Sequence, residues 1–133
     1  MIVVDTSVWI DFFADRPLPH VELLAQLVDD DAGLALTDVV LAEVLQGLRS
    51  DAVVRRVRRN LLAFDVVRLE SLRDFERAAS LYRSARQAGV TIRRTADCLI
   101  ASVCVRDRLP ILHADADFER LASCTPLRTV PIT

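Results

Sequence analysis

The order of apolar and polar residues along this chain changes repeatedly between two patterns. Short apolar runs bounded by polar residues are typical of buried strands, whereas apolar residues that recur every three or four positions indicate helices. Strands are predicted at 2–4, 34–36, 66–69, 111–112 and 127–130. Helices are predicted at 8–13, 20–29, 39–49, 51–63, from Ser71 to Gly89, and at 96–107 and 116–122. This alternation predicts an α/β sandwich around a mainly parallel sheet.

Length and composition narrow the class of protein. A chain of 133 residues fits a single domain, predicted here over 1–133. No apolar run is as long as a membrane span, and the start MIVVDTS has no basic leader, so we expect a cytoplasmic protein. Hydrophobic residues make up 52% of the chain, which is high for a soluble monomer. We therefore expect another subunit or a partner to cover part of the apolar surface.

The charged residues exclude several classes of function. All 17 basic residues are arginine, and the net charge of −2 argues against a protein that coats nucleic acid electrostatically. Receiver domains and haloacid-dehalogenase phosphatases, which also group acids at strand ends, both use a lysine that this chain lacks. A P-loop is excluded because its glycine-lysine motif is missing.

Two acids follow predicted strands closely. Ligand sites of parallel α/β sheets lie outside the carboxyl ends of the strands, which draws attention to Asp5 and Asp115. Asp117 lies two residues further along. The alternative for Asp5 is a helix N-cap, although Thr6 or Ser7 could serve equally well. For Asp115 and Asp117 the alternative is an ordinary polar loop that caps the next helix.

Two more acids interrupt apolar helices. Glu43 lies among apolar neighbours, where a carboxylate is costly unless it is paired or bound to a cation. A buried salt bridge to an arginine is the alternative. Asp97 shares an inward face with Ala101 and Cys104, although its place in the first helical turn also suits a dipole-capping role, with Thr95 the better cap.

Grouped together, these carboxylates would repel one another, and at least one would take up a proton. A hard divalent cation removes that repulsion, and oxygen ligands suit Mg²⁺ or Mn²⁺. The cysteines, in contrast, have no metal-binding spacing and are expected to be buried thiols: Cys98, Cys104 and Cys124.

Four blocks of sequence resemble a known family. DTSVWIDFF, LAEVLQGL, TADCLIAS and LPILHADADFERL are similar, in this order, to the PIN-domain ribonuclease toxins of the VapC family. The resemblance covers essentially the whole chain. It implies a PIN-like α/β/α sandwich with a short, mainly parallel sheet of four or five strands flanked by helices.

The resemblance also implies roles for individual residues. The acidic quartet of the family falls on Asp5, Glu43, Asp97 and Asp115, with Asp117 as a frequent fifth acid and Thr6 as the usual hydroxyl neighbour of the first aspartate. One departure is His113, where many PIN domains have threonine or serine; a structural role and a polar contact to the site are both open for it.

By the same resemblance the chain is an endoribonuclease toxin of a toxin–antitoxin pair that uses Mg²⁺ or Mn²⁺. It would form a homodimer and be inhibited by a VapB antitoxin. Trp9, Phe12 and Phe13 would either pack in the core or help to form the antitoxin groove.

The mechanism expected from these residues is metal-assisted hydrolysis of RNA by an activated water, which needs no histidine base. Asp5 and Asp97 would be the principal ligands. Arg93 and Arg94 could hold an RNA phosphate. Arginines of the helix 51–63 could do the same, or form a solvated face. The alternative function is a PIN-fold RNA- or protein-binding module without catalysis, and DNA is a further possible substrate.

Overall fold

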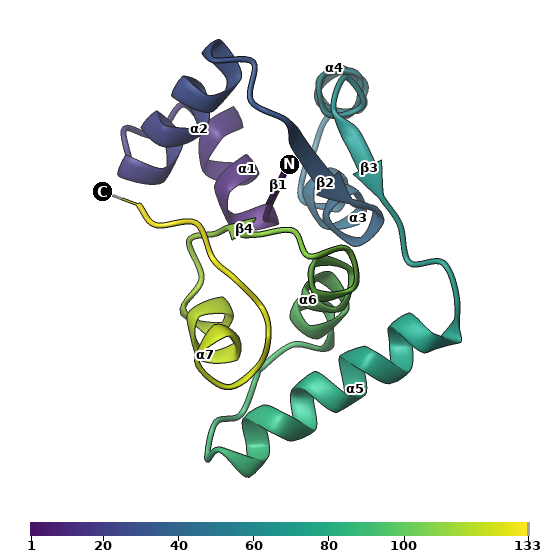
Figure 1. The fold of residues 1–133 in the computed structure, drawn as a ribbon. Helices are drawn as coiled ribbons and strands as arrows, with labels where there is room; N and C mark the ends of the chain where they lie inside the picture. Colours follow the sequence, from purple (N-terminus) through teal and green to yellow (C-terminus); the bar gives the residue numbers. More distant parts are fainter. Residues whose placement is uncertain (133) are drawn as a thin grey trace.

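The computed structural model describes residues 1–132 and contains a four-stranded parallel sheet in the order β3-β2-β1-β4 (Figure 1). The strands are β1 (Ile2–Val4), β2 (Leu34–Thr37), β3 (Asp65–Val67) and β4 (Ile111–Leu112). Strand β1 lies in the middle, where Val3 pairs with Ala35 on one side and with Ile111 on the other. Central strands of such a sheet are covered on both faces, which explains why β1 and β2 read as continuous apolar runs.

Seven helices surround the sheet in the described part of the chain. They are α1 (Thr6–Phe13), α2 (Pro19–Asp29), α3 (Asp38–Gln46), α4 (Asp51–Leu61), α5 (Leu72–Gln87), α6 (Thr95–Asp107) and α7 (Ala116–Cys124). Figure 1 shows α5 beside α6 on one side of the molecule, while α1 packs against α2 and α3. The α/β class and the parallel sheet predicted from the sequence are confirmed.

The core is formed by the strands and by the inward faces of all seven helices described above. Its largest fully buried side chains are Trp9 and Phe118. Trp9 donates its indole N–H to the carbonyl oxygen of Val4 at 3.0 Å, so the polar atom of this large side chain is satisfied inside the core. Helix α6 is buried over most of its length, and its apolar residues surround the acidic residue of its first turn.

Several helix ends follow from local chemistry. The Thr37 side chain caps α3 by accepting a hydrogen bond from the backbone N–H of Val40 at 3.0 Å. Helix α5 is followed by Gly89 with a φ of +84°, a conformation that favours glycine, as predicted for its stop. Helix α3 ends at Gln46, three residues earlier than predicted.

Two local predictions were wrong. Residues 127–130 do not form a regular strand and contribute one isolated bridge between Ile111 and Thr129. The N-cap position of α6 is Arg94 rather than Thr95, and no side chain caps it. In α5, Ala78, Leu81 and Ala85 are buried, whereas Phe75 of the same helix is 47% exposed. Packing of α5 against α6 accounts for this difference.

Within residues 1–132, no helix combines the length and apolar character needed to cross a membrane.

Candidate active site

The turn between β1 and α1 brings Asp5 to the carboxyl end of the central strand. Asp5 is buried and occupies the N-cap position of α1. Its Oδ2 accepts hydrogen bonds from the backbone N–H of Ser7 at 3.1 Å and from the Ser7 hydroxyl at 2.6 Å. The capping role considered for Asp5 is therefore real. Both of these bonds end on Oδ2, so capping engages one of its two oxygens.

Ser7 is a residue whose role the sequence reasoning missed. Besides donating to Asp5, its hydroxyl oxygen accepts the backbone N–H of Ala114 at 3.0 Å. Ala114 follows β4, so Ser7 ties the end of β4 to the end of β1. The DTS block contained the signal, because a hydroxyl two residues after a capping aspartate is well placed for such a link.

Glu43 projects from α3 toward the same turn. Its Oε1 accepts the Thr6 hydroxyl at 2.7 Å, which fixes the carboxylate across 37 positions of sequence. Among the described residues Glu43 forms no salt bridge, so the alternative of a buried arginine pair is not what the structure shows. Thr6 thus contacts the second acid of the site rather than only neighbouring the first.

Asp97 is buried in the first turn of α6, as its inward position in the pattern predicted. Its contacts come from Arg94, whose Nη2 lies 3.3 Å from Oδ1 and whose Nε lies 3.4 Å from Oδ2. The same Nη2 donates to Oδ2 of Asp115 at 2.8 Å. One guanidinium therefore joins two of the predicted site acids, which come from different elements.

Asp115 caps α7 and is oriented by its neighbours. Its Oδ1 accepts the backbone N–H of Asp117 at 3.0 Å, and its own backbone N–H donates to Nδ1 of His113 at 3.2 Å. Because Nδ1 accepts this bond, the other ring nitrogen of His113 carries the proton that meets Glu119 at 2.9 Å. His113 is thus a satisfied histidine that also fixes the turn bearing Asp115.

Asp117 has a different environment from the other four acids. It is fully buried, with Oδ1 accepting from Arg120 at 2.6 Å and Oδ2 accepting from the Arg93 side chain at 3.3 Å. Burial would raise the pKa of this carboxyl, but the hydrogen bonds from Arg120 and Arg93 hold it below its ordinary value. Its arginine pairs account for its charge without a metal.

The remaining acids act on one another electrostatically. Burial raises the pKa of Asp97 to about 6; Arg94 opposes this rise, and the charges of Asp115 and Asp5 add to it. Burial likewise raises the pKa of Asp5, where the Ser7 hydrogen bonds oppose the rise and the charge of Glu43 adds to it. The fold thus brings together four carboxylates from distant segments, and their mutual repulsion favours protonation.

Arg94 responds to the same cluster. Burial alone would lower the pKa of this guanidinium, but the charges of Asp97, Asp115 and Glu43 raise it. Several carboxylates thus act on one positive charge, and the same carboxylates could stabilise a hard divalent ion. We call Asp5, Glu43, Asp97 and Asp115 the acidic cluster.

The donor chemistry of the acidic cluster fits Mg²⁺ or Mn²⁺, because every donor is a carboxylate oxygen. In the conformation seen over residues 1–132, however, no three acidic, histidine or cysteine side chains are arranged to hold a metal ion. The positively charged guanidinium of Arg94 lies between Asp97 and Asp115 instead.

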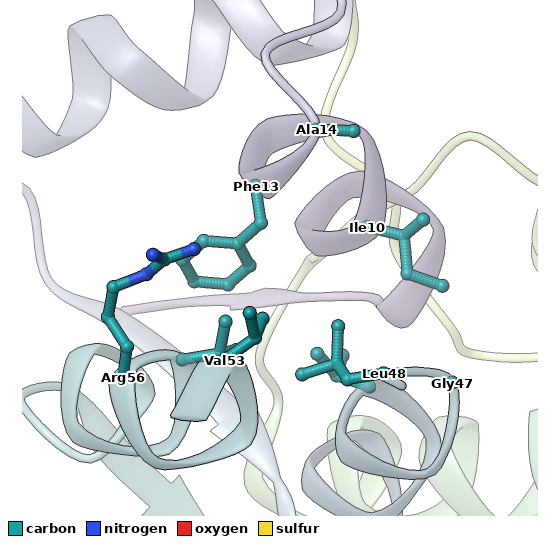
Figure 2. A pocket seen from close by; sticks show the side chains of 9 residues that line it. Ile10, Phe13, Ala14, Gly47, Leu48, Val53 and Arg56 are labelled. Atoms are coloured by element: carbon teal, nitrogen blue, oxygen red, sulfur yellow. The ribbon is translucent and has the colours of Figure 1, made fainter. Parts of the chain in front are cut away.

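An apolar groove lies apart from the acidic cluster, between α1 and α4. Its lining includes Ile10, Phe13, Val44, Leu48, Val53 and Arg56. Figure 2 shows Ile10 and Phe13 pointing from α1 into this groove, with Arg56 extending from α4 toward Phe13. Of the three aromatic residues considered for a partner groove, Phe13 lines it, whereas Trp9 is a core residue.

A second apolar groove, between α5 and α6, is lined by Phe75, Ala78, Ala79, Tyr82, Cys98 and Leu99, with Arg83 and Arg86 beside them. Ala78 and Cys98 are buried, whereas Phe75 and Ala79 are exposed and available for contact with another molecule.

Comparison with known proteins agrees with the fold. The PIN-domain family model matches residues 2–123. The chain is 35% identical to ribonuclease VapC11 of Mycobacterium tuberculosis and to VapC ribonuclease Mb1587 of Mycobacterium bovis, in each case over 96% of both chains. The structure of VapBC2 from Rickettsia felis, bound to a promoter DNA fragment, superposes with a TM-score of 0.77 over 98% of both chains at 18% identity.

The fold and the family match define a PIN-domain protein, and the chain belongs to the VapC family within that class. Its resemblance to this family, seen in four blocks of sequence, is thereby confirmed. The single domain over 1–133 stays a prediction.

Proposed function

We propose that this chain is a metal-dependent endoribonuclease and the toxin of a type II toxin–antitoxin pair in the cytoplasm. The observation that carries the proposal is the set of contacts that link four acids beyond the ends of the central strands. Thr6, beside Asp5, holds Glu43, and Ser7 links Asp5 to the residue before Asp115. Arg94 in turn joins Asp115 to Asp97. Relatives at 35% identity bear the name ribonuclease, which supports the reaction class.

Asp5 and Asp97 would be the principal ligands of Mg²⁺ or Mn²⁺, with Glu43 and Asp115 completing the site directly or through water. When bound, such an ion lowers the pKa of a water molecule and neutralises charge on phosphate oxygens. Asp117 was predicted as a fifth ligand; its pairing with Arg93 and Arg120 makes it the weakest of the five candidates.

Other residues of the site position these acids. Thr6 holds Glu43 through its hydroxyl, and His113 holds the backbone of Asp115. Arg93 and Arg94 are more than half exposed at the edge of the site, where guanidinium groups can pair with RNA phosphates. Cleavage by this route would leave 5′-phosphate and 3′-hydroxyl ends.

Cleavage of total RNA, with Mn²⁺ added and then chelated, tests the reaction. We expect metal-dependent cleavage that Asp5→Asn abolishes and that Asp11→Asn retains. Asp11 offers a matched control because it loses the same charge on the same helix but pairs with Arg16 and His20. RNA binding without cleavage in any metal would instead favour the non-catalytic module, and cleavage of DNA alone would change the substrate.

We further propose that a VapB-type antitoxin segment covers the groove between α1 and α4, and that two copies of the chain associate through α5 and α6. Solved structures with a similar fold include toxin–antitoxin complexes. Ile10 and Phe75 are large apolar side chains, 43% and 47% exposed, that belong to the first and second groove. Their exposure agrees with the apolar excess of the sequence.

These two surfaces can be separated by reciprocal variants. Ile10→Asp should abolish co-purification with a co-expressed VapB-type antitoxin and leave the dimer intact in sedimentation analysis. Phe75→Asp should dissociate the dimer and leave antitoxin capture intact. If either variant produces the opposite pattern, the assignment of that groove is wrong.

A further inference from the structure

Arg94 joins two members of the acidic cluster, Asp97 and Asp115. Its Nη2 lies 2.8 Å from Oδ2 of Asp115 and 3.3 Å from Oδ1 of Asp97, and its Nε lies 3.4 Å from the other oxygen of Asp97. Both carboxylate oxygens of Asp97 are therefore engaged by one guanidinium. A metal ion that takes these oxygens as ligands has to break the same contacts.

The contacts of Arg94 with the two aspartates fix the position of its side chain, but a competing cation can break them. Its two distances to Asp97 are long for charge-assisted hydrogen bonds, and only the bond to Asp115 is short. The side chain is 56% exposed, so it can leave toward solvent. Arg93, in contrast, engages Asp117 with Nε and approaches Asp115 only to 3.6 Å.

We propose that Arg94 is a built-in counter-cation, which neutralises Asp97 and Asp115 in the metal-free protein and competes with the divalent ion for them. This inference rests on the proposed metal site and adds a property of this chain to it. Metal-free protein would keep its carboxylates paired, and metal binding would release Arg94. The released guanidinium is then free to pair with a phosphate of the RNA.

If Arg94 competes with the metal ion, altering Arg94 should have the opposite effect to that usually seen when an active-site residue is altered. Removal of Arg94 should tighten metal binding, because the ion no longer displaces a paired cation. The loss of two exposed ion pairs of about 0.7 kcal/mol each should raise the affinity for Mn²⁺ by about tenfold. The same change should lower the melting temperature in chelator, because the carboxylates then repel without compensation.

Isothermal titration of Mn²⁺ into wild type, Arg94→Ala and Arg93→Ala tests the proposal without measuring activity. Arg93 is a matched control because it is adjacent and carries the same charge, so a general repulsion of cations would be relieved equally in both variants. We expect tightening of about tenfold for Arg94→Ala and a clearly smaller change for Arg93→Ala. Arg94→Gln should also tighten binding, and it replaces the alanine variant if that variant does not fold.

The outcomes separate this inference from the function on which it rests. If wild type binds Mn²⁺ and neither Arg94 variant binds it more tightly, competition is refuted while the metal site stands. Equal tightening in the Arg93 and Arg94 variants also refutes it, in favour of long-range repulsion. If no variant binds Mn²⁺ at all, the proposed metal site itself fails.

Discussion

Replacing Asp97 with asparagine should stabilise the metal-free protein, although Asp97 is a buried residue with two hydrogen-bonding contacts. Burial and the charges of Asp115 and Asp5 raise the pKa of Asp97 from its ordinary value of 3.8 to about 6, despite the opposing effect of Arg94. Above pH 6 the folded protein therefore holds a carboxylate that is more stable in the unfolded chain. Asparagine keeps the shape of the side chain and removes that charge.

The size of the effect follows from the pKa. A rise from 3.8 to about 6 corresponds to roughly 3 kcal/mol of lost stability at pH 8, because one pKa unit equals about 1.4 kcal/mol. The amide loses part of the attraction to Arg94, so we expect a net gain of about 1–3 kcal/mol. For a domain of this size the melting temperature should rise by roughly 3–10 °C.

Thermal unfolding of wild type and Asp97→Asn, in chelator and between pH 4 and 8, measures this gain. Because the folded pKa lies above the unfolded one, wild type takes up a proton on folding between these two values. The advantage of the variant should therefore be complete above pH 6 and disappear as the pH falls from 6 toward 4. In Mn²⁺ the order should reverse, because wild type alone gains stability from binding the ion.

Asp74 provides a matched control, since it is also a buried aspartate near the start of a helix. The backbone N–H of Glu70 donates to it at 2.7 Å, and Arg77 and Arg106 pair with it. These contacts lower its pKa to about 2 against the effect of burial. Its ionised form therefore stabilises the fold above pH 4, and this stability is lost as the pH falls toward 2. At pH 8, Asp74→Asn should destabilise the protein by roughly 2–3 kcal/mol.

The two substitutions are chemically identical and should act in opposite directions. A lower melting temperature for Asp97→Asn in chelator at pH 8 would refute the reasoning and make Asp97 a structural residue. If the higher melting temperature of Asp97→Asn persists unchanged at pH 4, the charge of Asp97 is not its cause.

Two further predictions concern single side chains. Thr6→Val should weaken Mn²⁺ binding and RNA cleavage several-fold, because Glu43 loses its hydrogen bond. Thr6→Ser keeps the hydroxyl and should retain both activities. Equal loss in the two variants would contradict this role of Thr6. Burial raises the pKa of the Cys98 thiol to about 11 and that of the Cys104 thiol to about 12. Iodoacetamide at pH 7 should therefore label the more accessible Cys124 first, which mass spectrometry can measure. Early labelling of Cys104 would contradict the structure.

The sequence by itself determined the fold class and singled out the acids of the proposed site. Short apolar strands between amphipathic helices leave few arrangements other than a parallel sheet covered by helices. Asp5 and Asp115 could be chosen because strand ends mark the ligand side of such a sheet, and Glu43 and Asp97 because carboxylates are costly in apolar helices. These properties are local, so a linear pattern carries them.

Tertiary structure decided how these residues meet. Phe75 and Leu81 are both apolar residues of α5, and only packing against α6 decided that Leu81 is buried while Phe75 is exposed beside a groove. The sequence placed Arg94 beside Asp97, yet only the fold brought it within 2.8 Å of Asp115, 21 positions away. Whether a charged side chain is a ligand, a cap or a counter-ion depends on distances of a few ångströms between distant segments, and Coulomb and hydrogen-bond energies change steeply over that range.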